Sequence, residues 1–194
     1  MVFNTILWVV LAYLLVHLFL FFVVSRIFVP FLGFKKHKLE NDIPNEIMDD
    51  IHKIKSKTKS KKEFTKEAFL FLSKKFKSLW FHTLLRFDIV FLRDLNKIYQ
   101  QKDFLSCNSH NHLLRIFLVK SGYYKDSQIE IRHTFLNFGI HQYLRVYDNG
   151  DNGKFFDLDL WGHTMGVPIG KHARIFRPSS LLSDIKEFFY GRKS

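Results

Sequence analysis

The chain has 194 residues, which is enough for one domain with an added segment but not for two large domains. Its 30 Lys and Arg against 18 Asp and Glu give a formal net charge of +12, so an anionic partner is expected, either nucleic acid or anionic lipid. A single Cys excludes an intramolecular disulfide and a cysteine-rich zinc site, and the few Pro and Gly exclude collagen-like repeats and low-complexity disorder.

The N-terminal part of the chain is strongly apolar. No charged residue occurs between Thr5 and Val24, and a helix of about 20 residues reaches the roughly 30 Å needed to cross the hydrocarbon core of a bilayer. The lack of basic residues before this segment, and of an Ala-x-Ala-like site after it, argues against a cleaved signal peptide. We therefore expect a retained transmembrane helix over residues 5–25.

Basic residues follow the apolar segment at once, namely Arg26, Lys35, Lys36 and Lys38. The positive-inside rule then predicts a single-pass membrane protein whose soluble domain lies in the cytoplasm. Because one short flank supplies the whole signal, the extracytoplasmic side stays open as the alternative.

Residues 26–62 are expected to form a basic juxtamembrane linker and helix. Six lysines lie in ten residues with no acidic residue between them: Lys53, Lys55, Lys57, Lys59, Lys61 and Lys62. Such a cluster can bind nucleic acid or anionic lipid headgroups. Because no base-stacking aromatics interleave with these lysines, nucleic acid is disfavoured and an anionic membrane surface is the expected partner. A merely solvated helix face is the alternative.

Four helices are predicted next in chain order. The first covers 44–58, and the second begins at the capping-box pair Ser60 and Glu63 and continues for about 17 residues with an apolar stripe. Residues 80–99 are apolar at helical spacing. A further apolar stripe ends at Gly122, which is a natural helix C-cap.

The hydrophobic pattern then changes to alternation. Residues 128–136 and 140–147 alternate as strands, and a third strand is predicted over 154–160 after the Asn- and Gly-rich turn 148–153. Helices followed by an antiparallel meander indicate an α+β domain, with helices packed on the sheet, over residues 63–194.

One cysteine and several histidines and aspartates could carry chemistry. Cys107 precedes the last predicted helix, where unpaired N–H groups and the positive end of the helix dipole stabilise a thiolate. A cysteine nucleophile needs a base, usually histidine, and a group that orients it. Antiparallel pairing can bring His141 of the second strand to Asp157 or Asp159 of the third. If the strand register differs, His133 takes the place of His141.

Three short motifs, in this order, resemble the transglutaminase-like superfamily. Its members typically show a Cys heading an apolar helix that ends in Gly, then H-a-W-x-x-V-Y, then G-x-W-x-x-x-D. The corresponding segments are CNSHNHLLRIFLVKSG at 107–122, HQYLRVY at 141–147 and GKFFDLD at 153–159. The resemblance spans about residues 95–165. With Phe155 at the family's Trp position it assigns the family's Asp to Asp159, while Asn108 replaces an aromatic residue that often follows the Cys.

The resemblance implies a papain-like α+β fold, without cofactor, and thiol acyl transfer on amide bonds of a protein or peptide substrate. Cys107 would attack the carbonyl, His141 would shuttle the proton, and Asp159 would hold His141. The acyl group would pass to water, as in a protease or amidase, or to an amine, as in a transglutaminase. The backbone N–H of Cys107, with Gln101 as a second candidate donor, would form the oxyanion hole. A catalytically inactive binding module tethered to the membrane is the alternative.

The other polar residues of the C-terminal half are not expected to form sites. Further histidines occur without zinc-ligand spacing, so no metal is expected: His110, His112, His133, His163 and His172. The Gly-rich stretch 162–173 lacks the Walker spacing, because Gly166 to Gly170 is one residue short. This stretch is therefore predicted to be a loop flanking the active-site cleft.

Overall fold

The computed structural model describes residues 2–19, 23, 25–33, 36–77, 86–101, 104–136, 139–148 and 154–173. The helices before the sheet are α1 (Val2–Phe19), α2 (Ser25–Phe28), α3 (Asn45–Lys57), α4 (Lys61–Lys75), α6 (Phe87–Val90), α7 (Leu95–Tyr99) and α8 (Cys107–Lys120). A 3-10 turn (Asp126–Gln128) leads into β1 (Ile129–Leu136), β2 (Gly139–Tyr147) and β3 (Phe155–Leu158), and α9 (Leu160–Thr164) follows. The predicted α+β class with an antiparallel sheet is confirmed.

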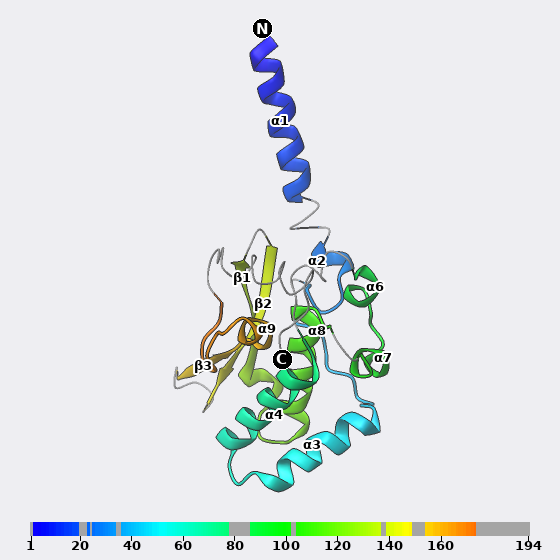
Figure 1. Cartoon of the computed structure of the whole chain (residues 1–194), viewed down its shortest axis with the longest axis vertical. Coiled ribbons are helices and arrows are strands. Elements are labelled where there is room, and N and C mark those ends of the chain that lie inside the picture. Colours follow the sequence, from blue (N-terminus) through cyan, green and yellow to red (C-terminus); the bar gives the residue numbers. More distant parts are fainter. Residues whose placement is uncertain are drawn as a thin grey trace, which may run out of the picture.

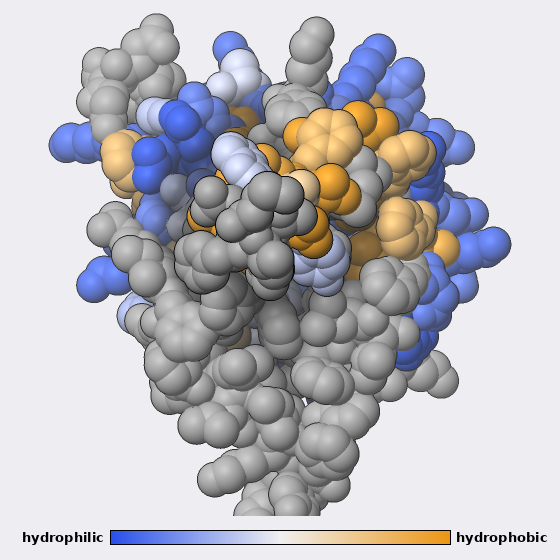
Figure 2. All heavy atoms as spheres, turned by 90° about the horizontal axis from the view of Figure 1, so that it is seen from above, coloured by the Kyte–Doolittle hydropathy of each residue, from blue (hydrophilic) through white to orange (hydrophobic). Residues whose placement is uncertain are grey.

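The apolar N-terminal helix stands apart from the rest of the molecule. α1 extends away from the body formed by the other helices and the sheet (Figure 1). Its described side chains are largely exposed, as for Trp8 at 68% and Tyr13 at 62%, and none of them joins the buried core cluster. Seen from the end that carries α1, apolar residues gather in one area that hydrophilic residues border (Figure 2).

The expected transmembrane helix over residues 5–25 is wrong. Among the described residues, no helix is both long enough and apolar enough to cross a bilayer. The described part of α1, Val2–Phe19, has 18 residues, which gives about 27 Å of helix against a hydrocarbon core of roughly 30 Å. Residues 20–22 and 24 lie outside the described part of the chain. The predicted single-pass membrane localisation is therefore wrong as well. The predicted cytoplasmic side depended on that span and is withdrawn with it.

α3 and α4 form where capping and apolar spacing predict them. Ser60 Oγ accepts a hydrogen bond from the backbone N–H of Glu63 at 3.2 Å, and the Glu63 carboxylate accepts one from the backbone N–H of Lys59 at 2.7 Å. The apolar stripe of α4 is buried: Phe64, Ala68, Phe69 and Leu72. Within the expected linker 26–62, Ile51 of α3 is buried in the same core.

The single helix predicted over 80–99 is divided in the structure. α6 and α7 are separate, and the Asp94 carboxylate accepts a hydrogen bond from the backbone N–H of Lys97 at 3.0 Å. Asp94 therefore caps a new helix instead of continuing the preceding one. Residues 80–85 of this prediction lie outside the described residues.

α8 is the central helix of the body. Residues 108–118 are all buried, and α8 contacts β2 as well as α3 and α4 (Figure 1). A buried helix must satisfy its polar side chains internally. Asn111 accordingly donates to the backbone carbonyl of Gln142 at 2.6 Å, and Arg115 donates to the Asp126 carboxylate in two bonds of 2.7 and 2.8 Å. These bonds connect α8 to the sheet and to the turn before it.

The strand register decides which face of the sheet each residue occupies. The strand order is β1-β2-β3, and Leu144 of β2 lies opposite both Ile131 of β1 and Leu158 of β3. Because successive side chains of a strand point to opposite faces, His141 lies on the other face from Leu144. β3 ends earlier than predicted, at Leu158, and Asp159 serves instead as the N-cap of α9.

We expect Ser60→Ala to lower the free energy of unfolding by about 1 kcal/mol, because the N–H of Glu63 loses its acceptor at the start of α4. Urea denaturation followed by circular dichroism measures the change. Ser56→Ala is the matched control, since exposed Ser56 donates only to a backbone carbonyl at the end of α3, and should change stability by less than about 0.5 kcal/mol. An equal loss in both variants would contradict the capping assignment.

Candidate active site

The N-terminus of α8 positions Cys107. Ser106 is the extended N-cap, with φ of −70° and ψ of 157°, and Cys107 is the first helical residue. The first intrahelical bond runs from the N–H of His110 to the Ser106 carbonyl at 3.0 Å. The N–H groups before His110 therefore have no acceptor within the helix. Cys107 is partly exposed, so its sulfur and these N–H groups lie at the helix end that favours negative charge.

His141 and Asp159 form a buried pair across the sheet. Nε2 of His141 lies 2.9 Å from each carboxylate oxygen of Asp159, and the two residues are only 3% and 1% exposed. The register places Arg145 opposite Asp157, so Asp159 falls on the diagonal from His141 once β3 has ended. Diagonal neighbours on one face are within reach of long side chains. The structure thus brings together the His and the Asp expected from the motifs.

The Asp159 carboxylate is held by two backbone N–H groups besides His141. It accepts hydrogen bonds from Gly162 at 2.7 Å and from Ala173 at 2.8 Å. A Cβ at position 162 would collide with this carboxylate, so glycine is required there. Burial raises the pKa of Asp159, but the charge and hydrogen bond of His141, together with the two N–H groups, outweigh burial and lower it. Asp159 therefore stays ionised and orients the imidazole.

The Cys107 side chain lies close enough to His141 to affect its protonation. Since Nε2 of His141 faces Asp159, the other ring nitrogen is left for the sulfur. Burial lowers the pKa of His141, but the Asp159 carboxylate, followed by the contact with Cys107, raises it to about 10. His141 thus holds its proton at neutral pH, between a sulfur and a carboxylate.

An aromatic side chain covers the His141 imidazole. The ring of Trp161 lies 5.1 Å from that of His141 and forms a small buried cluster with Val167 and Ala173, against which Cys107 packs. Apolar cover of this kind keeps water from the His–Asp pair and strengthens its attraction. Sequence analysis did not identify Trp161 as a site residue. Its position two residues after Asp159 could have indicated it.

The alternative base and acid lie elsewhere. Asp157 accepts hydrogen bonds from Arg145 at 2.8 and 3.2 Å and pairs with Nδ1 of His172 at 2.7 Å. His133 lies opposite Gln142 in the register, which places it on the other face of the sheet from His141. Neither residue is therefore placed to complete the Cys107 site.

Gln101 is not placed as an oxyanion donor. Its side-chain amide donates to the backbone carbonyl of Lys97 at 2.9 Å, at the end of α7. Within the described part of the chain, no contact joins it to Cys107. The spacing from Gln101 to Cys107 predicted an oxyanion donor, but the Gln101 side-chain amide is hydrogen-bonded to a carbonyl of α7 instead. The backbone N–H groups at the head of α8 remain as candidates.

A turn at residues 30–31 ties the cysteine helix to the histidine strand. The side chain of Asn108 donates to the carbonyl of Pro30 at 2.6 Å, and that of Gln142 donates to the carbonyl of Phe31 at 2.8 Å. Asn108 directly follows Cys107, and Gln142 directly follows His141. Phe31 has a φ of 61°, which is rare for a bulky residue. Sequence reasoning missed this turn, because nothing local indicates contact with α8 or β2.

Two further histidines of α8, His110 and His112, are buried. His112 pairs with Glu40, at 3.0 and 3.1 Å, and stacks on Phe31 with the ring centroids 3.9 Å apart. Burial lowers the pKa of His110 to about 3 against the opposing effect of Asp159, so His110 is neutral near pH 7. Among the described residues, no cluster of three or more metal-ligating side chains occurs.

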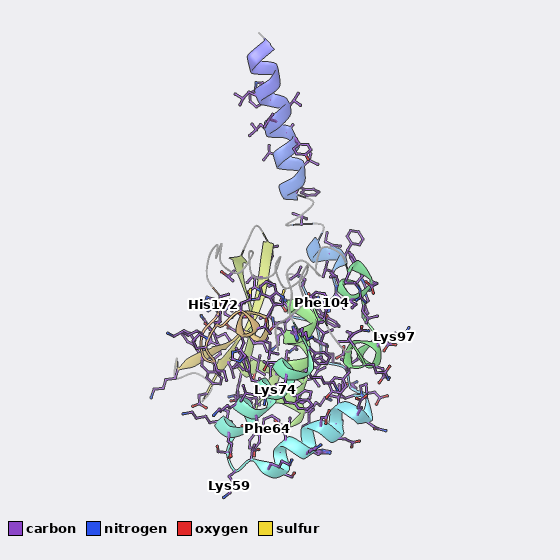
Figure 3. All side chains as sticks on the ribbon, viewed as in Figure 1. Lys59, Phe64, Lys74, Lys97, Phe104 and His172 are labelled. Atoms are coloured by element: carbon purple, nitrogen blue, oxygen red, sulfur yellow. The ribbon has the colours of Figure 1, made fainter. Side chains whose placement is uncertain are left out.

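The six lysines expected to bind anionic lipid are partly engaged in the fold. Lys55 donates to the Ser121 carbonyl at 2.7 Å, and Lys61 pairs with Asp148 at 3.3 Å. α3 and the start of α4 lie at the end of the body opposite α1 (Figure 1), where Lys59 points outward (Figure 3). The remaining members are exposed: Lys53, Lys57, Lys59 and Lys62.

We expect stability to fall as the pH rises from 6.5 toward 10. The pKa of His141 is raised from 6.5 to about 10, so in this window the folded state keeps a proton that the unfolded state releases. The stabilisation is complete below 6.5 and is lost as the pH passes 10, on the order of 1 kcal/mol for each pH unit. Urea denaturation across this window should show a shallower decline for His141→Gln, and an unchanged slope would contradict the assignment.

No protein-family model matches the chain, and no curated protein matches it either.

Proposed function

We propose that the chain is a thiol acyl-transfer enzyme, related to the transglutaminase-like superfamily, that acts on amide bonds of a protein or peptide. The observation that carries this proposal is the buried pair of His141 and Asp159, with the Cys107 side chain near the imidazole. A nucleophile, a base and an orienting carboxylate in series are the arrangement that covalent catalysis requires. A partly exposed sulfur beside a buried His–Asp pair also leaves the nucleophile open to substrate.

The first chemical step forms a thioester. In the reactive form the proton lies on His141, and the Cys107 sulfur attacks the amide carbonyl carbon as a thiolate while the carbonyl electron pair moves to oxygen. Backbone N–H groups at the head of α8 stabilise this oxyanion. When the tetrahedral intermediate collapses, the C–N bond breaks and His141 gives its proton to the leaving amine. The acyl group then remains on sulfur.

The second step releases the acyl group. Water or an amine approaches the thioester, and neutral His141 takes its proton as the new bond to the carbonyl carbon forms. The C–S bond then breaks, which restores the thiolate and the protonated imidazole. Asp159 does not transfer a proton in either step. Its two backbone hydrogen bonds hold it in place, so His141 keeps its orientation through both steps.

Asn108 and Gln101 take no part in either chemical step. The Asn108 side-chain amide donates to the Pro30 carbonyl, and that of Gln101 donates to the Lys97 carbonyl. A side-chain oxyanion donor of the papain kind is therefore not part of the proposal. This restricts the oxyanion hole to backbone N–H groups, which stabilise a negative charge without needing a particular side chain.

We expect iodoacetamide to alkylate Cys107 faster than a free thiol at pH 6–7, because protonated His141 supports the thiolate. His141→Ala and Asp159→Asn should each slow alkylation by about tenfold or more. His52→Gln is the matched control, because it removes an imidazole from an exposed position on α3 and leaves the site in place. Intact-mass measurement of the alkylated fraction over time gives the rates. If all three variants match the wild type, the triad assignment fails.

Acylation separates an enzyme from a catalytically inactive binding module. Mixed with p-nitrophenyl acetate, the protein should release a burst of p-nitrophenolate equal to its Cys107 content, with an acetyl group found on Cys107 by mass spectrometry. His141→Ala should slow the burst by about 100-fold. Hydroxylamine added after the burst should release the acetyl group. Absence of a burst in wild-type protein that still reacts rapidly with iodoacetamide would favour the binding module.

A further inference from the structure

A cavity lies between α4 and the strand β3, away from Cys107. It has a volume of about 480 Å³, within the range of ligand-binding pockets. Its walls come from the start of α4, the segment after α8, the end of β2, β3 and the loop after α9. Tyr124 of this wall follows the C-terminal end of α8, whereas Cys107 begins that helix, and a helix of 14 residues is about 20 Å long. The cavity is therefore separate from the site proposed above.

The walls of the cavity are mainly apolar. Phe156 of β3 and Ile169 of the loop after α9 contribute side chains, and the ring of Tyr124 adds an aromatic surface. Ile169 is 37% exposed and Tyr124 only 4% exposed, so the cavity runs from solvent to a closed inner wall. A surface of this kind gains free energy when an apolar group replaces water.

The polar groups in the wall already have partners within the protein. Thr65 Oγ1 and the Tyr124 hydroxyl share a hydrogen bond of 2.9 Å. The Asp148 carboxylate pairs with Lys61 at 3.3 Å, and the ammonium of Lys61 lies 4.2 Å from the centroid of the Tyr124 ring. These contacts neutralise Asp148, the one acidic side chain among the described residues that line the cavity. Polar specificity must then come from other residues.

Two lysines at the rim of the cavity supply positive charge. Lys62 and Lys66 both line the cavity, are exposed, and lie one helical turn apart on α4. Among the described residues, no ion pair includes either of them. The cavity thus combines an apolar interior with two positive charges at one edge.

We propose that this cavity binds an amphipathic carboxylate, with its alkyl chain against Phe156, Ile169 and Tyr124 and its carboxylate between Lys62 and Lys66. An alkyl chain matches the apolar walls, and a carboxylate matches the two lysines, which form no ion pair within the described part of the chain. This binding site is independent of the proposed acyl-transfer function. In this proposal Lys62, one of the lysines expected to contact anionic lipid, binds the carboxylate of the ligand.

Isothermal titration of the full chain with dodecanoate below its micelle concentration tests the proposal. Wild-type protein should bind dodecanoate with one site, and dodecyltrimethylammonium should not bind. The double variant Lys62→Gln/Lys66→Gln should bind about tenfold more weakly or worse. The matched control is Lys53→Gln/Lys57→Gln, which removes the same charge from exposed positions on α3 and should bind as the wild type does.

A second variant tests the apolar wall. Ile169→Asp changes an exposed side chain, so the fold should persist, and dodecanoate affinity should fall by about tenfold because a carboxylate then faces the bound chain. Cys107→Ser should bind dodecanoate unchanged, which distinguishes this site from the acyl-transfer site. Equal binding by the rim-lysine variant and the α3 control, equal binding of the cationic analogue, or loss of binding in Cys107→Ser would each overturn the proposal.

Discussion

The ion pair between His141 and Asp159 is the interaction on which the candidate site depends. Two charges with so little exposure are stable only when they are paired and their remaining hydrogen-bonding capacity is satisfied. Asp159 meets this condition through the N–H groups of Gly162 and Ala173, which come from α9 and from the loop that follows it. Consequently the helix cap, the glycine beside it and the returning loop all serve one carboxylate. The position of the imidazole, and hence its contact with the sulfur, follows from that arrangement.

The turn at Pro30 and Phe31 holds the two halves of the site together from outside. Its two carbonyls accept hydrogen bonds from the residues that follow the cysteine and the histidine. The left-handed backbone of Phe31 costs on the order of 1–3 kcal/mol, and such strain persists only where the surroundings hold it. Here the stacking of Phe31 on His112, together with both hydrogen bonds, supplies that restraint. A segment 76 residues away in sequence from Cys107 thus limits how far α8 can move from β2.

A second His–Asp pair lies on the same face of the sheet but serves another purpose. Asp157 binds both Arg145 and His172, and the His172 ring stacks flat on Tyr143 at 4.0 Å. These contacts fasten the loop after α9 to the sheet. Ala173, which follows His172, donates its backbone N–H to the Asp159 carboxylate. Ile169 of the same loop lines the cavity beside α4. One loop therefore connects the sheet, the candidate triad and the proposed carboxylate site.

Local sequence chemistry determined the helix capped by Ser60, the left-handed Gly122 after α8, the alternation of the strands and the place of Cys107 at a helix start. These features depend on residues a few positions apart, so a single sequence contains their causes. The choice of Asp159 over Asp157 followed from a motif resemblance, and its contact with His141 depends on where β3 ends and on the register with β2. The position of the Gln101 amide on α7 and the Phe31 turn were decided only by the tertiary structure. Each depends on which of several possible hydrogen-bond partners lies nearest in the folded chain. The spacing of residues in the sequence does not rank those partners.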